Sequence, residues 1–185
     1  MTLQPLWRGE SLRLLDERAL QDLPWLMEVA GAALADGILR ELGRRRFGPD
    51  ARLELWIGPG NNGGDGLVAF RHLEEMGLCP RIWAPLGLPK SGDAADALKH
   101  LNESGASIEI VDDAFASTPD LIVDCLFGTG LARPLSGSIA EAVEQHAALA
   151  IPVIACDVPS GLCADTGRVL GVALCADLTI TFGGL

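Results

Sequence analysis

Apolar and polar residues follow two different rhythms along this chain. Before residue 50, apolar residues recur at three- and four-residue spacing, the period of a helix with one buried face. This spacing predicts helices over 11–23 and 25–46. Further on, short apolar runs alternate with helical patterns. These runs predict strands at 53–57, 80–84, 107–111, 120–125, 152–156 and 177–182, and helices at 65–77, 91–104 and 136–149.

The alternation of strands and helices is typical of one fold class. Strands that read as continuous apolar runs are buried on both faces, which is the environment of a parallel sheet covered by helices on each side. The sequence therefore predicts an α/β fold with a parallel sheet. A length of 185 residues favours a single domain over 1–185.

Charge and cysteine content indicate which partners and which cellular compartment are compatible with the chain. The chain has 14 basic and 25 acidic residues, a net charge of −11, which disfavours a nucleic-acid or anionic membrane partner. The longest apolar run, 147–156, is too short to span a bilayer. The five cysteines form no Cys-x-x-Cys pair, which favours a reducing compartment and no zinc site. We therefore expect a cytoplasmic protein.

A glycine-rich stretch separates the first predicted strand from the helix after it. Five of the nine residues in 58–66 are glycine, and glycine lets a ligand approach the backbone closely. Gly58-x-Gly60-x-x-Gly63 matches the dinucleotide-binding pattern, but no acidic residue follows the next strand to hold a ribose. Asp65 would also repel a diphosphate. A turn with only a structural role is the alternative interpretation.

Three aspartates are predicted at the carboxyl ends of strands, where open parallel sheets bind ligands. They are Asp65, Asp124 and Asp157. Carboxylates crowded into one crevice repel each other unless one is protonated or a cation lies among them. Asn62 and Ser160 add further oxygen ligands, a set that selects a hard cation such as an alkali metal or Mg²⁺. The alternative is that each aspartate caps a helix or a turn.

No other residue type offers acid–base chemistry at these strand ends. The three histidines fall within predicted helices, away from the strand ends, and a Gly-x-Ser-x-Gly nucleophile motif is missing around Ser160. Acid–base chemistry is therefore assigned to the aspartates.

Three segments, in this order, resemble the NAD(P)H-hydrate epimerase family, or YjeF N-terminal domain. They are GPGNNGGDG at 58–66, VDCLFGTGL at 123–131 and DVPSGL at 157–162. The resemblance implies a Rossmann-like three-layer sandwich, with a mostly parallel central sheet, helices on both faces and an N-terminal helical segment. It also implies an isomerase that interconverts the R and S forms of hydrated NADH and NADPH (NAD(P)HX), a repair of damaged nicotinamide cofactor.

The resemblance also assigns roles to particular residues. Because epimerisation needs a proton donor and acceptor near the hydroxyl, we expect Asp157 to be the acid–base group, with Asp124 as a second catalytic residue that, together with the cation, sets the charge state of Asp157. One potassium ion per subunit is expected on Asn62, Asp124 and Ser160, with NAD(P)HX as substrate rather than cofactor. The residues expected to contact this substrate are Asn61, Asn62, Gly63, Gly64, Asp65, Gly128, Thr129, Gly130, Leu131, Ala132, Arg133, Pro134 and Asp157.

The family also suggests partners and one rival function. Relatives form homodimers or are fused to an ADP- or ATP-dependent NAD(P)H-hydrate dehydratase. Family domains usually continue beyond the last predicted strand, so a domain truncated at its C-terminus is expected. Some proteins of this fold are non-catalytic ligand- or protein-binding scaffolds. The polar residues retained in all three segments favour the enzyme.

Overall fold

The computed structural model describes residues 26–115 and 117–182 and contains a six-stranded parallel sheet. The helix predicted at 11–23 lies outside the described residues. The strands are arranged in the order β3-β2-β1-β4-β5-β6. The elements are α2 (Leu26–Arg45), β1 (Leu53–Ile57), α3 (Asn61–Glu75), β2 (Arg81–Trp83), α4 (Gly92–Glu103), β3 (Glu109–Val111), β4 (Leu121–Cys125), α5 (Gly137–Leu149), β5 (Val153–Cys156) and β6 (Leu178–Ile180).

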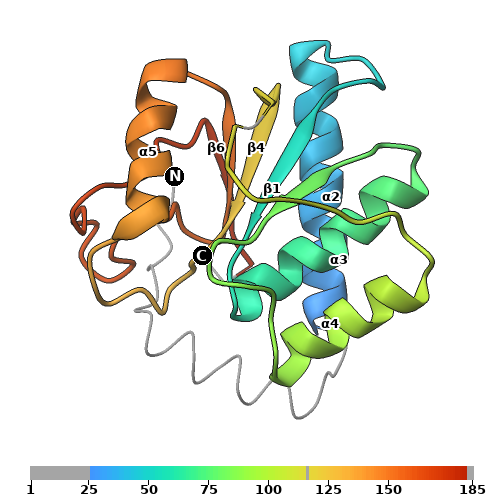
Figure 1. The fold of residues 1–185 in the computed structure, drawn as a ribbon, viewed down its shortest axis with the longest axis horizontal. Coiled ribbons are helices and arrows are strands. Elements are labelled where there is room, and N and C mark those ends of the chain that lie inside the picture. The colour runs from blue at the N-terminus through green and yellow to red at the C-terminus, as the bar shows by residue number, and fades with distance from the viewer. Residues whose placement is uncertain (1–25, 116, 183–185) are drawn as a thin grey trace, which may run out of the picture.

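Helices cover both faces of the sheet, as the apolar runs predict. Helices α2, α3 and α4 lie on one side and α5 on the other (Figure 1). Within β1, Leu53, Leu55 and Ile57 belong to the core beneath α2, α3 and α4, whereas Trp56 belongs to the core beneath α5. Every residue of β1, β4 and β5 is buried because the sheet is covered twice. The predicted α/β class is confirmed.

The strand order reverses between β1 and β4, because the chain adds β2 and β3 on one side of β1 before it returns to the other. These two strands pair from Leu53 with Leu121 to Ile57 with Cys125. The segments after Ile57 and Cys125 therefore leave the sheet side by side. Such a switch point opens a crevice at the carboxyl ends of the strands, where ligands bind in this class of fold.

Helix α3 begins at Asn61, four residues before the predicted start at 65. The glycines that suggested a longer loop lie inside the helix, where close packing requires them. A Cβ atom at Gly64 would lie 2.6 Å from Sδ of Met27, and one at Gly66 would lie 2.8 Å from Sγ of Cys125. These glycines let α3 approach α2 and β4, so packing outweighs their low helix propensity.

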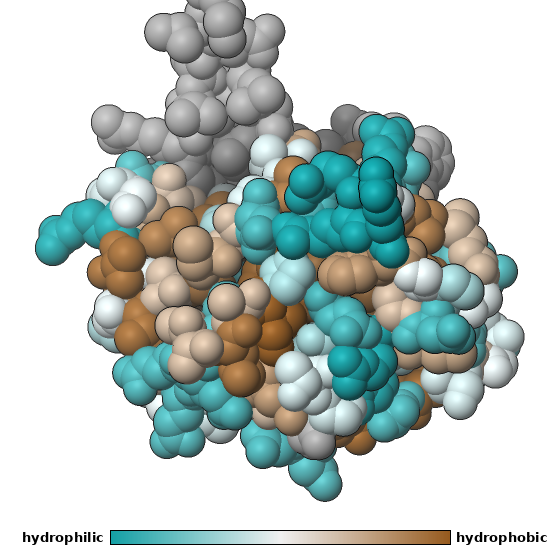
Figure 2. Space-filling model, turned by 90° about the horizontal axis from the view of Figure 1, so that it is seen from above, coloured by the Kyte–Doolittle hydropathy of each residue, from teal (hydrophilic) through white to brown (hydrophobic). Residues whose placement is uncertain are grey.

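The remaining boundaries shift by a few residues at most. Helix α2 matches the prediction over 25–46, and β6 is three residues long instead of the six predicted over 177–182. No helix among the described residues has the length and apolar content that crossing a membrane requires. Seen from above, the surface carries scattered hydrophobic residues among hydrophilic ones (Figure 2).

Candidate functional site

Asp124 is a fully buried carboxylate near the carboxyl end of β4, with 0% of its surface exposed. Its Oδ1 accepts hydrogen bonds from Ser160 Oγ at 2.7 Å and from the Leu126 amide at 3.2 Å, and its Oδ2 accepts one from the Ser160 amide at 2.7 Å. Burial raises the pKa of Asp124 to about 6, although the hydrogen bonds oppose that rise. Among the described residues, no cationic side chain pairs with this buried acid.

Ser160 connects the segments that follow β4 and β5. Its hydroxyl donates to Asp124 and accepts a hydrogen bond from the Phe127 amide at 3.1 Å. Its carbonyl accepts from the Leu174 amide at 2.9 Å. Ser160 therefore holds Asp124 in place and has one hydroxyl lone pair left for a further partner.

Asp157 directly follows β5 and supplies a second carboxylate. Its Oδ2 accepts a hydrogen bond from the Thr129 amide at 3.1 Å, and its Oδ1 accepts one from the Thr181 hydroxyl at 3.4 Å. Burial raises the pKa of Asp157, and these two hydrogen bonds oppose the rise. Asp157 therefore takes up a proton more readily than an exposed aspartate does.

Asn62 lies in the first turn of α3 with an unsatisfied side chain. Its Oδ1 and Nδ2 atoms are both buried and have no hydrogen-bond partner among the residues that the structure describes. A Cβ atom placed on Gly128 would lie 3.5 Å from Asn62 Oδ1 and 2.6 Å from Asp157 Oδ2, so both side chains border the space over Gly128. Because an unpaired buried amide is costly, this arrangement favours a bound polar group or ion.

Asp65, in the same helix, is next to Gly66, which packs against Cys125 of β4. Burial is the main cause of the raised pKa of the Cys125 thiol, and the negative charges of Asp124 and Asp65 add to it. Charge from Asp65 can act in this way only from nearby. The aspartates nevertheless form no metal-binding cluster of their own, since no group of three or more His, Cys, Asp or Glu side chains in the described ranges could hold a metal ion.

The other residues predicted to bind substrate belong to the first turn of α3 and to the loop after β4. Gly63 and Gly64 are buried, so only their backbone is available to a ligand. Asn61, Gly130, Ala132, Arg133 and Pro134 are exposed, and Gly128, Thr129 and Leu131 are partly buried. Leu135 donates its amide to the Leu170 carbonyl at 3.3 Å, which ties this loop to the segment after β5.

Sequence reasoning missed Thr181 as a member of the site. Thr181 was part of the strand predicted at 177–182, but nothing in its local pattern indicated a hydrogen bond to Asp157. The histidines lie on α3, α4 and α5, as predicted. One of them, His146, is bonded to the Ile151 carbonyl at 2.6 Å, a structural role.

Comparisons with known proteins place the chain in a family. The sequence model described as YjeF-related protein N-terminus matches residues 24–185. The chain belongs to this family, as its motifs predicted.

Several curated relatives are similar over most of the chain. An NAD(P)H-hydrate epimerase of Limosilactobacillus fermentum is 39% identical over 157 residues, which cover 85% of this chain and 73% of the relative. A bifunctional NAD(P)H-hydrate repair enzyme of Thermofilum pendens is 39% identical over 95% of this chain, which spans only 35% of that relative. The crystal structure of yeast ynu0 has a TM-score of 0.80 at 24% identity, covering 95% of this chain and 79% of the yeast chain, and supports the fold.

Proposed function

We propose that this protein is an isomerase that interconverts the R and S epimers of NAD(P)HX. Relatives that carry the name NAD(P)H-hydrate epimerase are 35–39% identical to it over the aligned residues, and they support this activity. The structural observation that carries the proposal is the unpartnered amide of Asn62, which borders the same small space as the Asp157 carboxylate.

The hydrated ring carbon can be inverted either by loss and return of its hydroxyl or by opening and closing of the ring. We propose the first route, in which the hydroxyl leaves and returns on the opposite face. In the proposed mechanism, protonated Asp157 donates its proton to the leaving hydroxyl, which departs as water and leaves a cationic ring. The resulting carboxylate then accepts a proton from the water that adds to the other face. The raised pKa of Asp157 suits this exchange, because it brings the carboxyl closer to neutral pH than the pKa of an exposed aspartate.

Potassium is part of the same proposal. Within 26–115 and 117–182, the residues present fit a hard cation: Oδ1 of Asn62 is buried and unpartnered, Asp124 is a buried acid without a cationic partner, and the Ser160 hydroxyl has one free lone pair. Asn62, Asp124 and Ser160 would hold the ion. The ion would supply a fixed positive charge. With that charge nearby, Asp124 would stay ionised, and a negative Asp124 would favour the protonated form of Asp157.

The direct test is a stereochemical assay with the purified chain and R-NADHX. The buffer contains potassium in one arm and tetramethylammonium in the other, and Asp157→Asn serves as the inactive control. Epimerisation only in potassium supports both the activity and the ion. Equal rates in both buffers refute the proposed potassium site but support the epimerase activity. No epimerisation by the folded protein refutes the activity.

The partners and the cellular location are proposals. The relatives support the proposed partners in outline. Bifunctional relatives suggest cooperation with a second repair activity, for which an ADP- or ATP-dependent dehydratase is the proposed partner. A homodimer and a cytoplasmic location complete the proposal. All five cysteines are free in the structure, which suits a reducing compartment.

A further inference from the structure

The backbone of Asp157 adopts a conformation that few residues other than glycine adopt. Its φ is +64°, and the amide of Val158 donates a hydrogen bond to the carbonyl of Cys156 at 2.8 Å. A bond between residues two apart with a positive φ between them defines a γ-turn of the rare, strained kind. Such strain persists only where the surroundings hold it, and it concentrates at functional sites.

Two other non-glycine residues with positive φ lack this setting. Arg46 and Ala150 follow the last residues of α2 and α5, where a left-handed residue commonly ends a helix. Asp157 instead follows a strand and carries the carboxylate proposed to react. The γ-turn therefore fixes the direction in which this side chain leaves the backbone.

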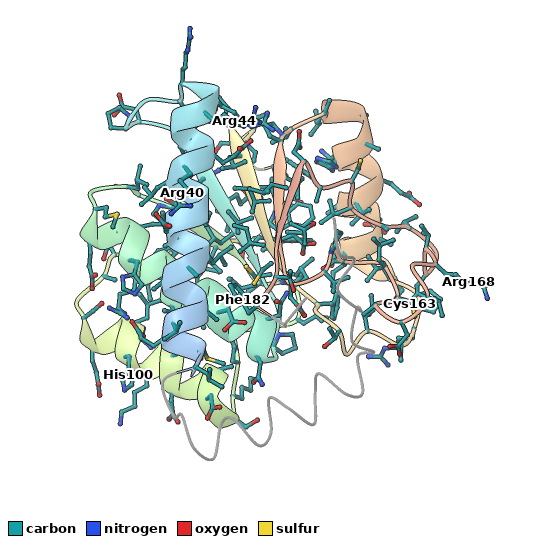
Figure 3. The ribbon with its side chains drawn as sticks, turned by 180° about the vertical axis from the view of Figure 1, so that it is seen from behind. Arg40, Arg44, His100, Cys163, Arg168 and Phe182 are labelled. Atoms are coloured by element: carbon teal, nitrogen blue, oxygen red, sulfur yellow. The ribbon has the colours of Figure 1, made fainter. Side chains whose placement is uncertain are left out.

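The end of β6 restrains Asp157 at two points. The Asp157 amide donates to the Ile180 carbonyl at 2.7 Å, which continues the pairing of β5 with β6 by one residue. The hydroxyl of the next residue, Thr181, donates to Oδ1 at 3.4 Å. In the view from behind, labelled Phe182, the residue after Thr181, lies toward the end of the molecule where α3 begins (Figure 3).

The two carboxylate oxygens of Asp157 thus have different partners. Oδ2 is held by the Thr129 amide and lies on the side of Gly128 and Asn62, where the substrate is proposed to bind. Oδ1 has only the Thr181 hydroxyl as a hydrogen-bond partner among the described residues. Without this hydroxyl, the carboxylate could rotate about its single bonds and turn Oδ2 away from the substrate side.

We propose that Thr181 is a positioning residue, whose hydroxyl holds the Asp157 carboxylate in its reactive orientation. This inference rests on the proposed epimerase function. It assigns a part in the reaction to the residue that follows the last strand of the described sheet, although Thr181 itself need not touch the substrate. Orientation matters most in the transition state, so the loss of Thr181 should lower kcat and leave KM nearly unchanged.

The test compares three variants in the epimerisation assay: Thr181→Val, Thr181→Ser and Thr179→Val. Thr179→Val is the matched control, since it makes the same change at an exposed position two residues earlier in β6. We expect Thr181→Val to lose about tenfold in kcat, a modest share of what misplaced catalytic groups can cost. Thr181→Ser, which keeps the hydroxyl, should recover most of that loss, and Thr179→Val should match the wild type.

Two results would overturn the proposal. One is a Thr181→Val enzyme with the same kcat as Thr179→Val. The other is a Thr181→Ser enzyme as slow as Thr181→Val, which would point to strand packing instead of the hydroxyl. Thermal unfolding of all variants shows whether any loss follows from a destabilised fold.

Failure of the proposed function would be visible separately, because the wild-type chain would then show no epimerisation. In that case crystal structures of the wild type and Thr181→Val decide the positioning role. A changed Asp157 side-chain torsion in the variant supports it, and an unchanged torsion refutes it.

Discussion

Replacing Gly128 by alanine would place a single methyl group in the space over Gly128, which Asn62 and Asp157 border. The added Cβ would lie 2.6 Å from Asp157 Oδ2, whereas a relaxed contact between carbon and oxygen needs about 3.5 Å. The carboxylate must therefore retreat by about 0.9 Å, the difference between these two distances. That movement stretches its hydrogen bond from the Thr129 amide, which is 3.1 Å long in the native structure.

We expect Gly128→Ala to lose roughly 100-fold in kcat/KM, because a displacement of about 1 Å at a reacting group can have an effect of this size. Gly128 has no positive φ, so alanine adds no backbone strain there, and the fold should lose no more than about 1 kcal/mol from overpacking. Steady-state kinetics with NADHX and thermal unfolding measure the two quantities separately.

Gly48→Ala is the control, since a Cβ at that position meets nothing within 4 Å and the residue lies between α2 and β1, outside the predicted site. It should keep both activity and stability. If Gly128→Ala is as active as Gly48→Ala, the space over Gly128 is not where the substrate reacts, and the assignment of Asp157 fails with it.

Three further predictions concern the ion, the pH dependence of stability and the packing of α2. Asp124→Asn removes the buried charge without changing the shape of the side chain. Activity should fall, and its dependence on potassium should disappear in a titration with KCl. A variant that potassium still stimulates would contradict the proposal that Asp124 is a ligand of the ion. Hydrogen bonds from Arg44 and then Arg45 lower the pKa of Glu41 to about 2. The stabilisation from this lowered pKa is present above the unfolded-state value of 4.5 and is lost as pH falls toward 2, so the gap in Tm between the wild type and Glu41→Gln should shrink over that range. A constant gap would mean that Glu41 acts through packing alone. Gly31→Ala places a Cβ against Val68 and 2.8 Å from the Asp65 carbonyl, and should destabilise the fold by about 1–3 kcal/mol in denaturant unfolding; an unchanged midpoint would show that α2 and α3 can separate.

The sequence predicted β1 to the residue and missed the start of α3, for related reasons. The apolar run at 53–57 is bounded by polar residues and glycine, so its ends are visible locally. Gly64 and Gly66 are typical of loops in isolation, and only their contacts with Met27 and Cys125 explain why they belong in a helix. Those contacts depend on packing between elements, which a local pattern does not contain.

Some residues of the site could likewise be predicted from the local sequence, and others could not. The strand ends located Asp124 and Asp157, because parallel strands present their carboxyl ends at one edge of the sheet. The hydrogen bond from Thr181 joins residues 24 positions apart, through the pairing of β5 with β6. No periodicity in the chain predicts that hydrogen bond.

The glycines packed into α3 also have a thermodynamic consequence for ligand binding. A glycine within a helix costs about 0.5–1 kcal/mol of stability relative to alanine, because it loses more freedom on folding. In α3, Gly64 packs against Met27 and Gly66 against Cys125. These glycines therefore lose their conformational entropy when the chain folds. The turn that carries Asn62 is therefore already ordered before a ligand arrives. A substrate that meets such a preorganised turn loses little binding energy to ordering it.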